Sequence, residues 1–405
     1  MPDFEIDLNK AATAVKDPPV EAKEPKGVVA KLRLIEDELK GFFIERNEVI
    51  HGAILAHVAK EHILMLGPPG CAKSDIAESL SAAFNGSKLF YYLMTRFTTP
   101  EEIFGQLSVR ALEQDRFNRV TVGRLPEASD VVLDEIFKSS SSILNSLLMA
   151  INERKFFNDG VMTKLPLHTV TGTSNELPES KELDALYDRF MLRYNVGYIR
   201  ETSGLKRLLM APDHKFKTTV DYSEITKAHE EAMQIPVPEE SADMLTRIAL
   251  NLREEGIFVS DRRIRNCQHV IKAEAFLSGK TKVDEESIEI IQHCMWNDPK
   301  EISKTRSVIL GVANPLAQQA LEKYEMALEI KNNVYAIKED DKRKKATLEA
   351  NGKIKKLHVD LKKIVEEMKA KGKPAARYEE MQNRITVMHS EMLMECLGID
   401  QKTLA

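Results

Sequence analysis

The octapeptide 67-GPPGCAKS-74 combines the residue types that hold a nucleoside triphosphate: glycines for a tight turn, a lysine and a hydroxyl. In such a loop, backbone N–H groups backed by a helix N-terminus surround the phosphate oxygens. Lys73 would reach the β- and γ-phosphates, and Ser74 would bind a magnesium ion. A turn that merely joins a strand to a helix is the weaker alternative. The residues expected to contact the nucleotide are Gly67, Pro68, Pro69, Gly70, Cys71, Ala72, Lys73 and Ser74.

Ala72 stands where the usual form of this loop has a second glycine before the lysine. One methyl group at the start of a helix is a small steric demand, unlike a β-branched or bulky side chain. The surroundings also fit, because an apolar run at 63–66 precedes the loop and the helical pattern DIAESLSAAF follows it. We therefore expect the loop to be functional.

Two carboxylates, Asp134 and Glu135, follow apolar residues in 131-VVLDE-135. They would lie at the carboxyl end of a strand, where open α/β sheets bind their ligands. Asp134 would hold magnesium through water, and Glu135 would orient and deprotonate the attacking water. Alone, such a pair is more often a solvated helix start. Together with the upstream loop it predicts nucleotide hydrolysis.

Strands and helices that must position these residues alternate along the chain up to about residue 200. Short β-rich runs are separated by helical patterns, which predicts a parallel α/β sheet with flanking helices. The runs are Ile63–Leu66, Lys88–Leu93, Val131–Leu133 and His168–Thr173. Residues 220–296 show only helical pattern and predict an all-α domain. We expect a disordered tail over 1–30, an α/β nucleotide-binding domain over 31–205, an all-α lid over 206–300 and a helical region over 301–405.

The C-terminal region carries two apolar seams among lysines and glutamates. Residues Ile354 to Met368 and Met381 to Met392 each repeat apolar side chains at steps of three and four, which is typical of a coiled coil. The break KGKPAAR between them predicts an antiparallel helical hairpin. A self-packed hairpin is favoured because apolar seams are usually core. An extended, Met-rich binding arm stays as the alternative.

The composition argues against a nucleic-acid-binding, membrane-spanning or disulfide-rich protein. The chain has 405 residues, a net charge of −5 and a pI near 6.1, so no global positive field attracts nucleic acid or an anionic membrane. No uninterrupted apolar stretch of membrane-spanning length occurs, so we expect no transmembrane segment. The four cysteines are far apart and form no CxxC pair. We expect reduced thiols and a cytoplasmic location.

At this point the series of motifs resembles the AAA+ ATPases of the MoxR family, and within them the RavA branch. The resemblance covers roughly residues 30 to 300. It is carried by 67-GPPGCAKS-74, 93-LMTRFTTPEEIFG-105, 123-GRLPEASDVVLDEIFK-138, 144-LNSLLMAINER-154, 173-TSNELPES-180, 186-LYDRF-190 and 260-SDRRIRN-266. It implies the AAA+ fold and an ATPase that uses ATP and Mg²⁺.

The resemblance also assigns three further residues. Asn175 matches sensor 1, which polarises the attacking water, although asparagine is common in turns. Arg189 matches the arginine finger that reaches the γ-phosphate held by a neighbouring subunit; the alternative is a surface arginine paired to Asp188 or Asp184. Arg262 falls at sensor 2 and would contact the γ-phosphate of its own subunit. Arg263, one residue away, is the alternative.

Two inserts match the family as well. Residues 100–125 predict a short helix plus a β-hairpin, and KFFNDGVMTKLP predicts a hairpin that turns at Asp159-Gly160. In the family these inserts line the pore-facing side of a ring, whereas their sequences alone also allow ordinary surface hairpins. Residues 301–405 depart from RavA, because no β-rich insertion interrupts the lysine-rich helices.

The resemblance implies a homo-hexameric Mg-ATPase that remodels a client protein in a chaperone-like way, with a von Willebrand factor A domain partner. A nucleic-acid motor is the main rival, but the anionic Asn-Asp-Gly hairpin tip disfavours contact with DNA, and we expect no nucleic acid. A hydrolysis-dead scaffold would not need Lys73, Glu135, Asn175 and Arg189 together.

Overall fold

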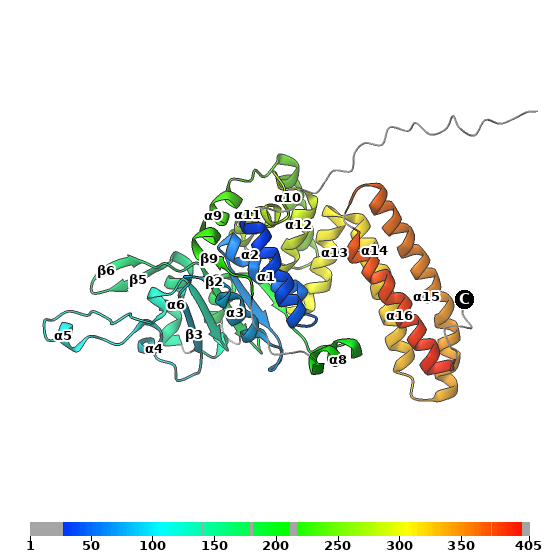
Figure 1. Cartoon of the computed structure of the whole chain (residues 1–405), viewed down its shortest axis with the longest axis horizontal. Coiled ribbons are helices and arrows are strands. Elements are labelled where there is room, and N and C mark those ends of the chain that lie inside the picture. Colours follow the sequence, from blue (N-terminus) through cyan, green and yellow to red (C-terminus); the bar gives the residue numbers. More distant parts are fainter. Residues whose placement is uncertain (1–26, 140, 179–180, 211–216, 374, 399–405) are drawn as a thin grey trace, which may run out of the picture.

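The computed structural model describes residues 27–139, 141–178, 181–210, 217–373 and 375–398, so most of the expected N-terminal tail lies outside the described residues. A five-stranded sheet organises the first half of the chain (Figure 1). Its order is β3-β4-β7-β1-β8, and every pairing is parallel. The strands are β1 (His62–Leu66), β3 (Leu89–Leu93), β4 (Asp130–Asp134), β7 (Thr169–Ser174) and β8 (Phe190–Asn195). The predicted parallel α/β sheet is confirmed.

Strand β1 lies between two apolar cores because its side chains alternate between the two faces. Ile63 and Met65 face the core that contains α1 (Val28–Phe42) and α2 (Asn47–Ala59). Leu64 and Leu66 instead face the core that contains α6 (Ser141–Glu153). Helices α3 (Lys73–Ala82) and α7 (Lys181–Tyr187) complete the layers. Burial on both faces explains why β1 appears in the sequence as a continuous apolar run.

The two inserts project from one side of the sheet (Figure 1). The predicted hairpin at Asp159-Gly160 is confirmed: β5 (Lys155–Asn158) and β6 (Val161–Lys164) are antiparallel, and both turn residues have positive φ. The other insert begins with α4 (Pro100–Phe104), as expected. Its predicted β-hairpin is reduced to a single antiparallel bridge between Leu107 and Arg119, and its tip is the helix α5 (Val109–Leu112). Ser108 favours the helical turn by accepting a hydrogen bond from the Ala111 N–H.

A helical lid follows the sheet. Helix α8 (Thr202–Met210) leads to the minor two-stranded sheet of β2 (Phe84–Asn85) and β9 (Val220–Asp221). The lid helices are α9 (Tyr222–Met233), α10 (Glu239–Glu254), α11 (Asp261–Leu277), α12 (Glu285–Glu289) and α13 (Ile302–Ala313). Their apolar faces merge with the core over α1 and α2, so the lid packs beside these two helices.

The C-terminal region is a bundle of three helices, α14 (Pro315–Tyr335), α15 (Asp340–Ala370) and α16 (Ala376–Leu397) (Figure 1). The predicted antiparallel hairpin is α15 and α16, and its seams are core: Ile354, Leu361 and Met392 are fully buried. Helix α14 packs on both and completes the apolar core, which favours the self-packed hairpin.

The four cysteines are free and buried. In the described ranges of the chain, no helix joins the length to the apolarity that crossing a lipid bilayer requires.

Candidate functional site

The phosphate loop and the two carboxylates meet at the carboxyl edge of the sheet. Strand β7 pairs with both β1 and β4, so the ends of these three strands are neighbours. The Gly67 N–H donates to the Ser174 carbonyl at 3.0 Å, and the Thr173 hydroxyl donates to the Asp134 carboxylate. The expected loop and the expected magnesium ligand are therefore brought together by β7.

The loop backbone is shaped by its glycines. A Cβ on Gly67 would lie 2.0 Å from the Val196 carbonyl oxygen, so only glycine fits there. Gly70 has a φ of +77°, a left-handed conformation that favours glycine. Among the described residues, no acceptor is found for the N–H groups of Gly70, Cys71 and Ala72. Free N–H groups in front of a helix N-terminus are what a phosphate requires.

Ala72 is under backbone strain, which its side-chain size did not predict. Its φ of +63° and ψ of +27° are left-handed, directly before the first residue of α3. An L-residue with a Cβ loses roughly 1–2 kcal/mol in this conformation. The expectation of a minor methyl effect is therefore corrected: the larger cost lies in the backbone, and the loop still adopts its turn.

Lys73 and Arg46 hold the loop in place. The Lys73 ammonium donates to the carbonyls of Gly67 at 2.7 Å and Pro68 at 2.9 Å, and the side chain is 8% exposed. Arg46, at the start of α2, donates to the Cys71 carbonyl at 3.2 Å. It also donates to the carbonyl of Gly197 at 2.6 Å. Sequence reasoning missed Arg46, because a lone arginine before a helix carries no spacing signal.

Asp134 has a second partner that the sequence did not reveal. The Tyr91 hydroxyl, from the neighbouring strand β3, donates to Asp134 Oδ2 at 3.1 Å. Burial and the Asp134 carboxylate together raise the pKa of Tyr91 to about 12, so it stays a donor at neutral pH. Tyr91 and Thr173 fix the orientation of the carboxylate that would face the metal. The alternating strand pattern placed Tyr91 two residues before the strand end but gave it no role.

Glu135 leaves the sheet in a left-handed conformation, with φ +53° and ψ +43°. Because of this turn, the Glu135 side chain does not have to point to the opposite face of the sheet from Asp134, as it would in a regular strand. Its Oε2 lies 3.4 Å from the Lys138 ammonium and is buried without a hydrogen-bond partner among the described residues. A carboxylate oxygen with unused acceptor capacity beside the phosphate loop can take a proton from water.

Asn175 directly follows β7 and is exposed at the same edge. The turn after the strand is made by its neighbour: Ser174 Oγ accepts from the Glu176 N–H at 3.2 Å and donates to the Glu176 carbonyl at 2.8 Å. The Asn175 side chain is thus not needed for the turn, which weakens the reading of a simple turn residue.

Arg189 lies at the opposite, amino edge of the sheet, between α7 and β8. The next residue, Phe190, pairs with His62 at the start of β1, whereas the phosphate loop follows the end of β1. The length of a five-residue strand, roughly 17 Å, separates the two edges. Arg189 forms no ion pair with Asp188 or Asp184, and its Nε and Nη1 are buried without partners in the described part of the chain. The arginine cannot serve the loop of its own subunit.

Arg263 is part of the framework. It is 1% exposed and donates through Nη1 to the carbonyls of Met191 at 2.9 Å and Cys294 at 2.8 Å. Through Nη2 it donates to the carbonyls of Asp188 at 3.0 Å and Phe190 at 2.8 Å. These bonds tie the start of α11 to the start of β8.

Arg262 is exposed beside it, at the same amino edge. Ser260, the cap of α11, lies 3.4 Å from the Asp188 carboxylate, so this helix begins where β8 begins. This arrangement places Arg262 at the amino edge of the sheet, so its expected contact with the γ-phosphate of its own subunit stays a prediction that the position of α11 does not favour. The lid packs beside α1 and α2, and its helix α11 is tied at its first turn to the start of β8.

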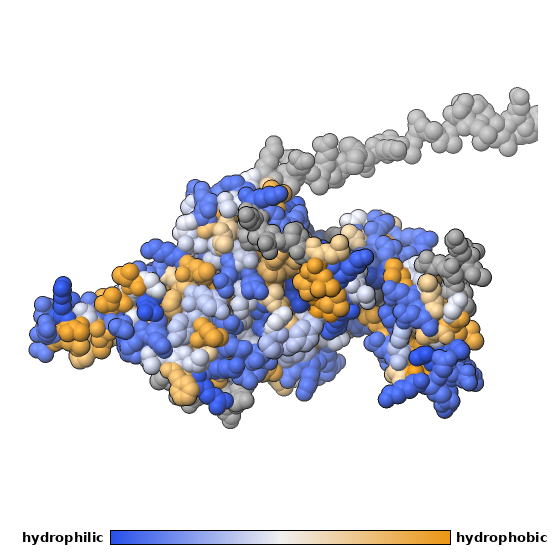
Figure 2. Space-filling model, turned by 60° about the horizontal axis from the view of Figure 1, so that its bottom comes forward, coloured by the Kyte–Doolittle hydropathy of each residue, from blue (hydrophilic) through white to orange (hydrophobic). Residues whose placement is uncertain are grey.

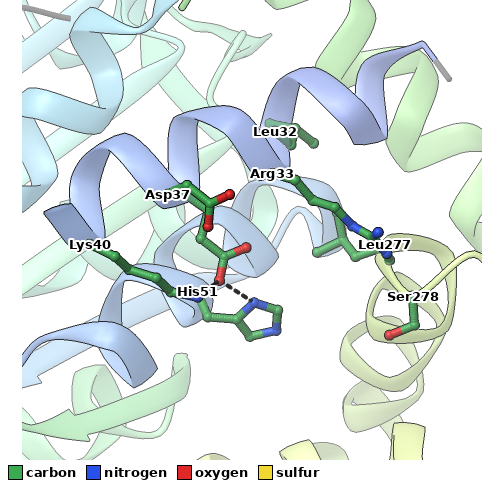
Figure 3. Close-up of a pocket in the computed structure, with 8 residues that line it drawn as sticks. Leu32, Arg33, Asp37, Lys40, His51, Leu277 and Ser278 are labelled. Carbon is green, nitrogen blue, oxygen red and sulfur yellow. Dashed lines mark hydrogen bonds and ion pairs between the residues drawn. The ribbon is translucent and has the colours of Figure 1, made fainter. Parts of the chain in front are cut away.

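Charged contacts hold the lid in that position, beside a pocket lined by residues of α1, α2 and the end of α11 (Figure 3). His51 of α2 lies 2.8 Å from Glu274 of α11 and 3.1 Å from Glu36 of α1. Burial opposes the charge on His51, but the two carboxylates prevail and raise its pKa to about 10. Arg33 donates to the Leu277 carbonyl at 2.8 Å and lines the same pocket. The pocket joins lid to core and lies apart from the phosphate loop.

Comparison with known proteins identifies the family of both domains. Residues 30–234 match the family model of the MoxR domain in MoxR-vWA-beta-propeller ternary systems, and residues 240–309 match an AAA lid domain.

Two relatives and one solved structure extend this result. An uncharacterised protein of Methanocaldococcus jannaschii, MJ0812, is 38% identical over 86% of this chain and 95% of its own length. The chaperone MoxR1 of Mycobacterium tuberculosis is 25% identical over 47% of this chain and 50% of its own length. A crystal structure of a Cytophaga hutchinsonii protein described as an ATPase covers 70% of this chain and 93% of that one, with a TM-score of 0.55 and 19% identity. This last likeness supports the fold alone.

Proposed function

The chain belongs to the MoxR family of AAA+ ATPases, and from this premise we propose that it hydrolyses Mg-ATP at the interfaces of a homo-hexameric ring. The observation that carries the proposal is the division of the site between the two edges of the sheet. The loop, Asp134 and Glu135 share one edge, whereas Arg189 lies at the other with unused donors. A complete site requires both edges, and therefore two subunits.

The residues at the carboxyl edge fit ATP and magnesium. Free N–H groups of Gly70, Cys71 and Ala72 would hold phosphate oxygens, and Lys73 would exchange its loop carbonyls for them. The Ser74 hydroxyl and the Asp134 carboxylate are the hard oxygen donors that Mg²⁺ prefers. Bound magnesium would neutralise charge on the phosphates.

Hydrolysis then needs a base and an orienting group. Glu135 takes the proton of the attacking water through its buried, hydrogen-bond-free Oε2. Asn175, exposed one residue beyond β7, holds that water in line. Arg189 of the neighbouring subunit places a planar cation against the charge that spreads over the transferring phosphoryl group. Arg262 lies at the same edge as Arg189 and acts on the same neighbouring site.

The ring would act on a client protein through the two inserts. Figure 2 shows apolar side chains gathered over the projecting inserts. Exposed apolar side chains there are Val109, Leu112, Phe117, Val120, Val122, Phe157, Val161 and Met162. A patch of this kind on a projecting element marks a site of protein contact. It supports chaperone-like remodelling.

The proposed partner is a protein with a von Willebrand factor A domain, supported by the family model, whose description names MoxR-vWA-beta-propeller systems. A RavA-like membership within the family stays a hypothesis, because the described residues after 301 form helices alone. The cytoplasmic location also stays a prediction, consistent with four free cysteines.

The rival functions receive less support. At the hairpin tip, Asp159 accepts a hydrogen bond from Arg116 Nε at 2.8 Å, so this arginine of the adjacent insert is already paired with a carboxylate. A scaffold without hydrolysis would not need Lys73, Glu135, Asn175 and Arg189 together.

The proposal is tested by measuring phosphate release from Mg-ATP by the full chain and by Lys73→Ala, with the mass of each assembly determined in parallel. We expect turnover only in the first, and a six-fold assembly with nucleotide. Equal turnover in Lys73→Ala, or full activity as a monomer, would contradict it. Capture of proteins from the native host with and without ATP then identifies the client and partner.

A further inference from the structure

Helix α15 presents an unusual outward face. Residues 342–363 contain nine basic and two acidic residues, a net charge of +7 in a chain whose total is −5. The apolar side of α15 is buried on α14 and α16 in the bundle core. Eight of the nine basic residues are exposed, and six of these lie on the side of α15 that faces away from the bundle.

The lysines on this face form two rows with an apolar line between them. At 100° per residue, Leu348, Gly352 and Val359 fall within about 40° of one another, opposite the buried side. Leu348 is 60% and Val359 is 49% exposed, and a Cβ on Gly352 would meet open space.

The two lysine rows lie about 50° to either side of this line. Lys345, Lys356 and Lys363 form one row, and Lys344, Lys355 and Lys362 form the other; all six are exposed. Among the described residues, only Lys344 of the six forms an ion pair, with Asp340 at 2.8 Å. The pattern extends for about 29 Å along the helix.

We propose that this face of α15 is a docking surface for an acidic amphipathic helix of another protein, which places small apolar residues on Leu348, Gly352 and Val359 and carboxylates against both lysine rows. An apolar line flanked by like charges is the arrangement that selects an oppositely charged partner in coiled coils. The absence of a side chain at Gly352 allows the partner helix to approach closely.

Other occupants fit less well. A second copy of α15 would set lysine against lysine, which disfavours self-association. A membrane surface requires a broad apolar face, and that of α15 is already buried. Single-stranded nucleic acid would use aromatic platforms, and residues 342–363 contain no Phe, Tyr or Trp. The docking surface goes beyond the proposed function, because it does not involve ATP.

The test uses the full chain and a designed fluorescent peptide, a helix with an alanine and leucine seam flanked by glutamates. A scrambled peptide of the same composition reports the contribution of charge alone. A DNA duplex and phosphatidylserine vesicles are the other probes. We expect the designed peptide to bind at least ~10-fold more tightly than the scrambled one, with neither of the other probes bound as well.

Two variants separate the parts of the surface. Lys345→Glu/Lys356→Glu/Lys363→Glu removes one row, and Leu348→Asp/Val359→Asp removes the apolar line; each should weaken peptide binding at least ~10-fold. Glutamine at the same three lysines removes charge without reversing it and should weaken binding less. The matched control, Lys227→Glu/Arg247→Glu/Lys282→Glu, changes the charge equally on exposed lid positions and should bind normally.

Equal binding of the two peptides, equal or tighter binding of duplex or vesicles, or no loss in both α15 variants would overturn the proposal. Glu135→Gln is included as a separate arm, because it stops the proposed hydrolysis and should leave peptide binding unchanged. A failure of the ATPase proposal is thereby distinguishable from a failure of the docking surface.

Discussion

The two edges of the sheet use their polar groups in opposite ways. At the carboxyl edge, Lys73 and Asp134 have partners within the chain that a nucleotide and a metal can replace. At the amino edge, Arg193 and Arg263 are committed to backbone carbonyls, and Arg189 alone of these three keeps two nitrogens without partners. In the function proposed above, the carboxyl edge serves its own subunit, whereas the amino edge offers Arg189 to a neighbouring subunit.

The largest effect on turnover is expected from substitution of Arg189, which removes the contribution of the amino edge. We expect Arg189→Ala to bind ATP normally and to lose ~10³–10⁵-fold in turnover, because the finger stabilises charge in the transition state. Arg189→Lys should restore little, since an ammonium lacks the planar fork.

Mixing Arg189→Ala with Lys73→Ala provides the control. An intact loop on one subunit can then meet an intact finger on the next, and some phosphate release should return. With subunit exchange confirmed by a tag, no recovery at any ratio would show that the arginine acts within its own chain.

Glu135→Gln tests the carboxyl edge. The amide keeps the shape of the side chain but cannot accept the proton, so turnover should fall by ~10²–10⁴-fold. ATP binding and assembly, measured by nucleotide fluorescence and by mass, should be retained. Hydrolysis near the original rate would mean that another group is the base.

Arg263→Ala and Arg262→Ala compare a buried structural arginine with the exposed arginine next to it in the sequence. Loss of the buried guanidinium removes a donor from four backbone carbonyls and should cost ~3–5 kcal/mol in the free energy of unfolding. Loss of the exposed Arg262 should change the free energy of unfolding by less than ~0.5 kcal/mol while lowering turnover. Urea unfolding measures both, and equal destabilisation would contradict the separate roles.

His51 gives a pH-dependent prediction. Its pKa is raised from 6.5 to about 10, so its contribution to stability is fully present below pH 6.5 and is lost as the pH rises through 10. The destabilisation caused by His51→Gln should therefore shrink between pH 6.5 and pH 10. Urea unfolding of both proteins across this range checks it, with His389→Gln in the bundle as control. A constant difference would show that packing, not charge, is lost.

The smallest effect concerns Ala72. Ala72→Gly relieves the left-handed strain but adds freedom to the unfolded chain, so we expect a gain of at most ~1 kcal/mol in the free energy of unfolding. Thermal unfolding measures it, and turnover should change little. A loss of stability would mean that the methyl packs favourably.

The sequence predicted what repeats along the chain and missed what depends on tertiary position. Strand β1 was found from its apolar run, the hairpin from its Asp159-Gly160 turn and the seam of α15 from its periodic apolar residues. Strand β8 was missed because Arg193 interrupts its apolar pattern; in the structure this side chain is buried on the Tyr187 ring and donates to the Trp296 carbonyl.

The site shows the same limit. Lys73, Ser74 and Asp134 were assigned from spacing, and the structure brings them to one edge. The edge at which Arg262 lies was not predictable, because it follows from how the whole lid packs. The strain at Ala72 was also hidden, since φ is a property of the folded turn and not of residue size.

The two attachments of α11 set how force can travel through the molecule. Arg263 fastens one end of this helix to β8, and Glu274 fastens it to α2 through His51, roughly 16 Å further along the helix axis. A helix attached at two separated points cannot rotate about either one without breaking the contacts at the other. We therefore expect lid and sheet to move as one rigid unit, so that in the proposed ring the movement driven by hydrolysis would take place between subunits.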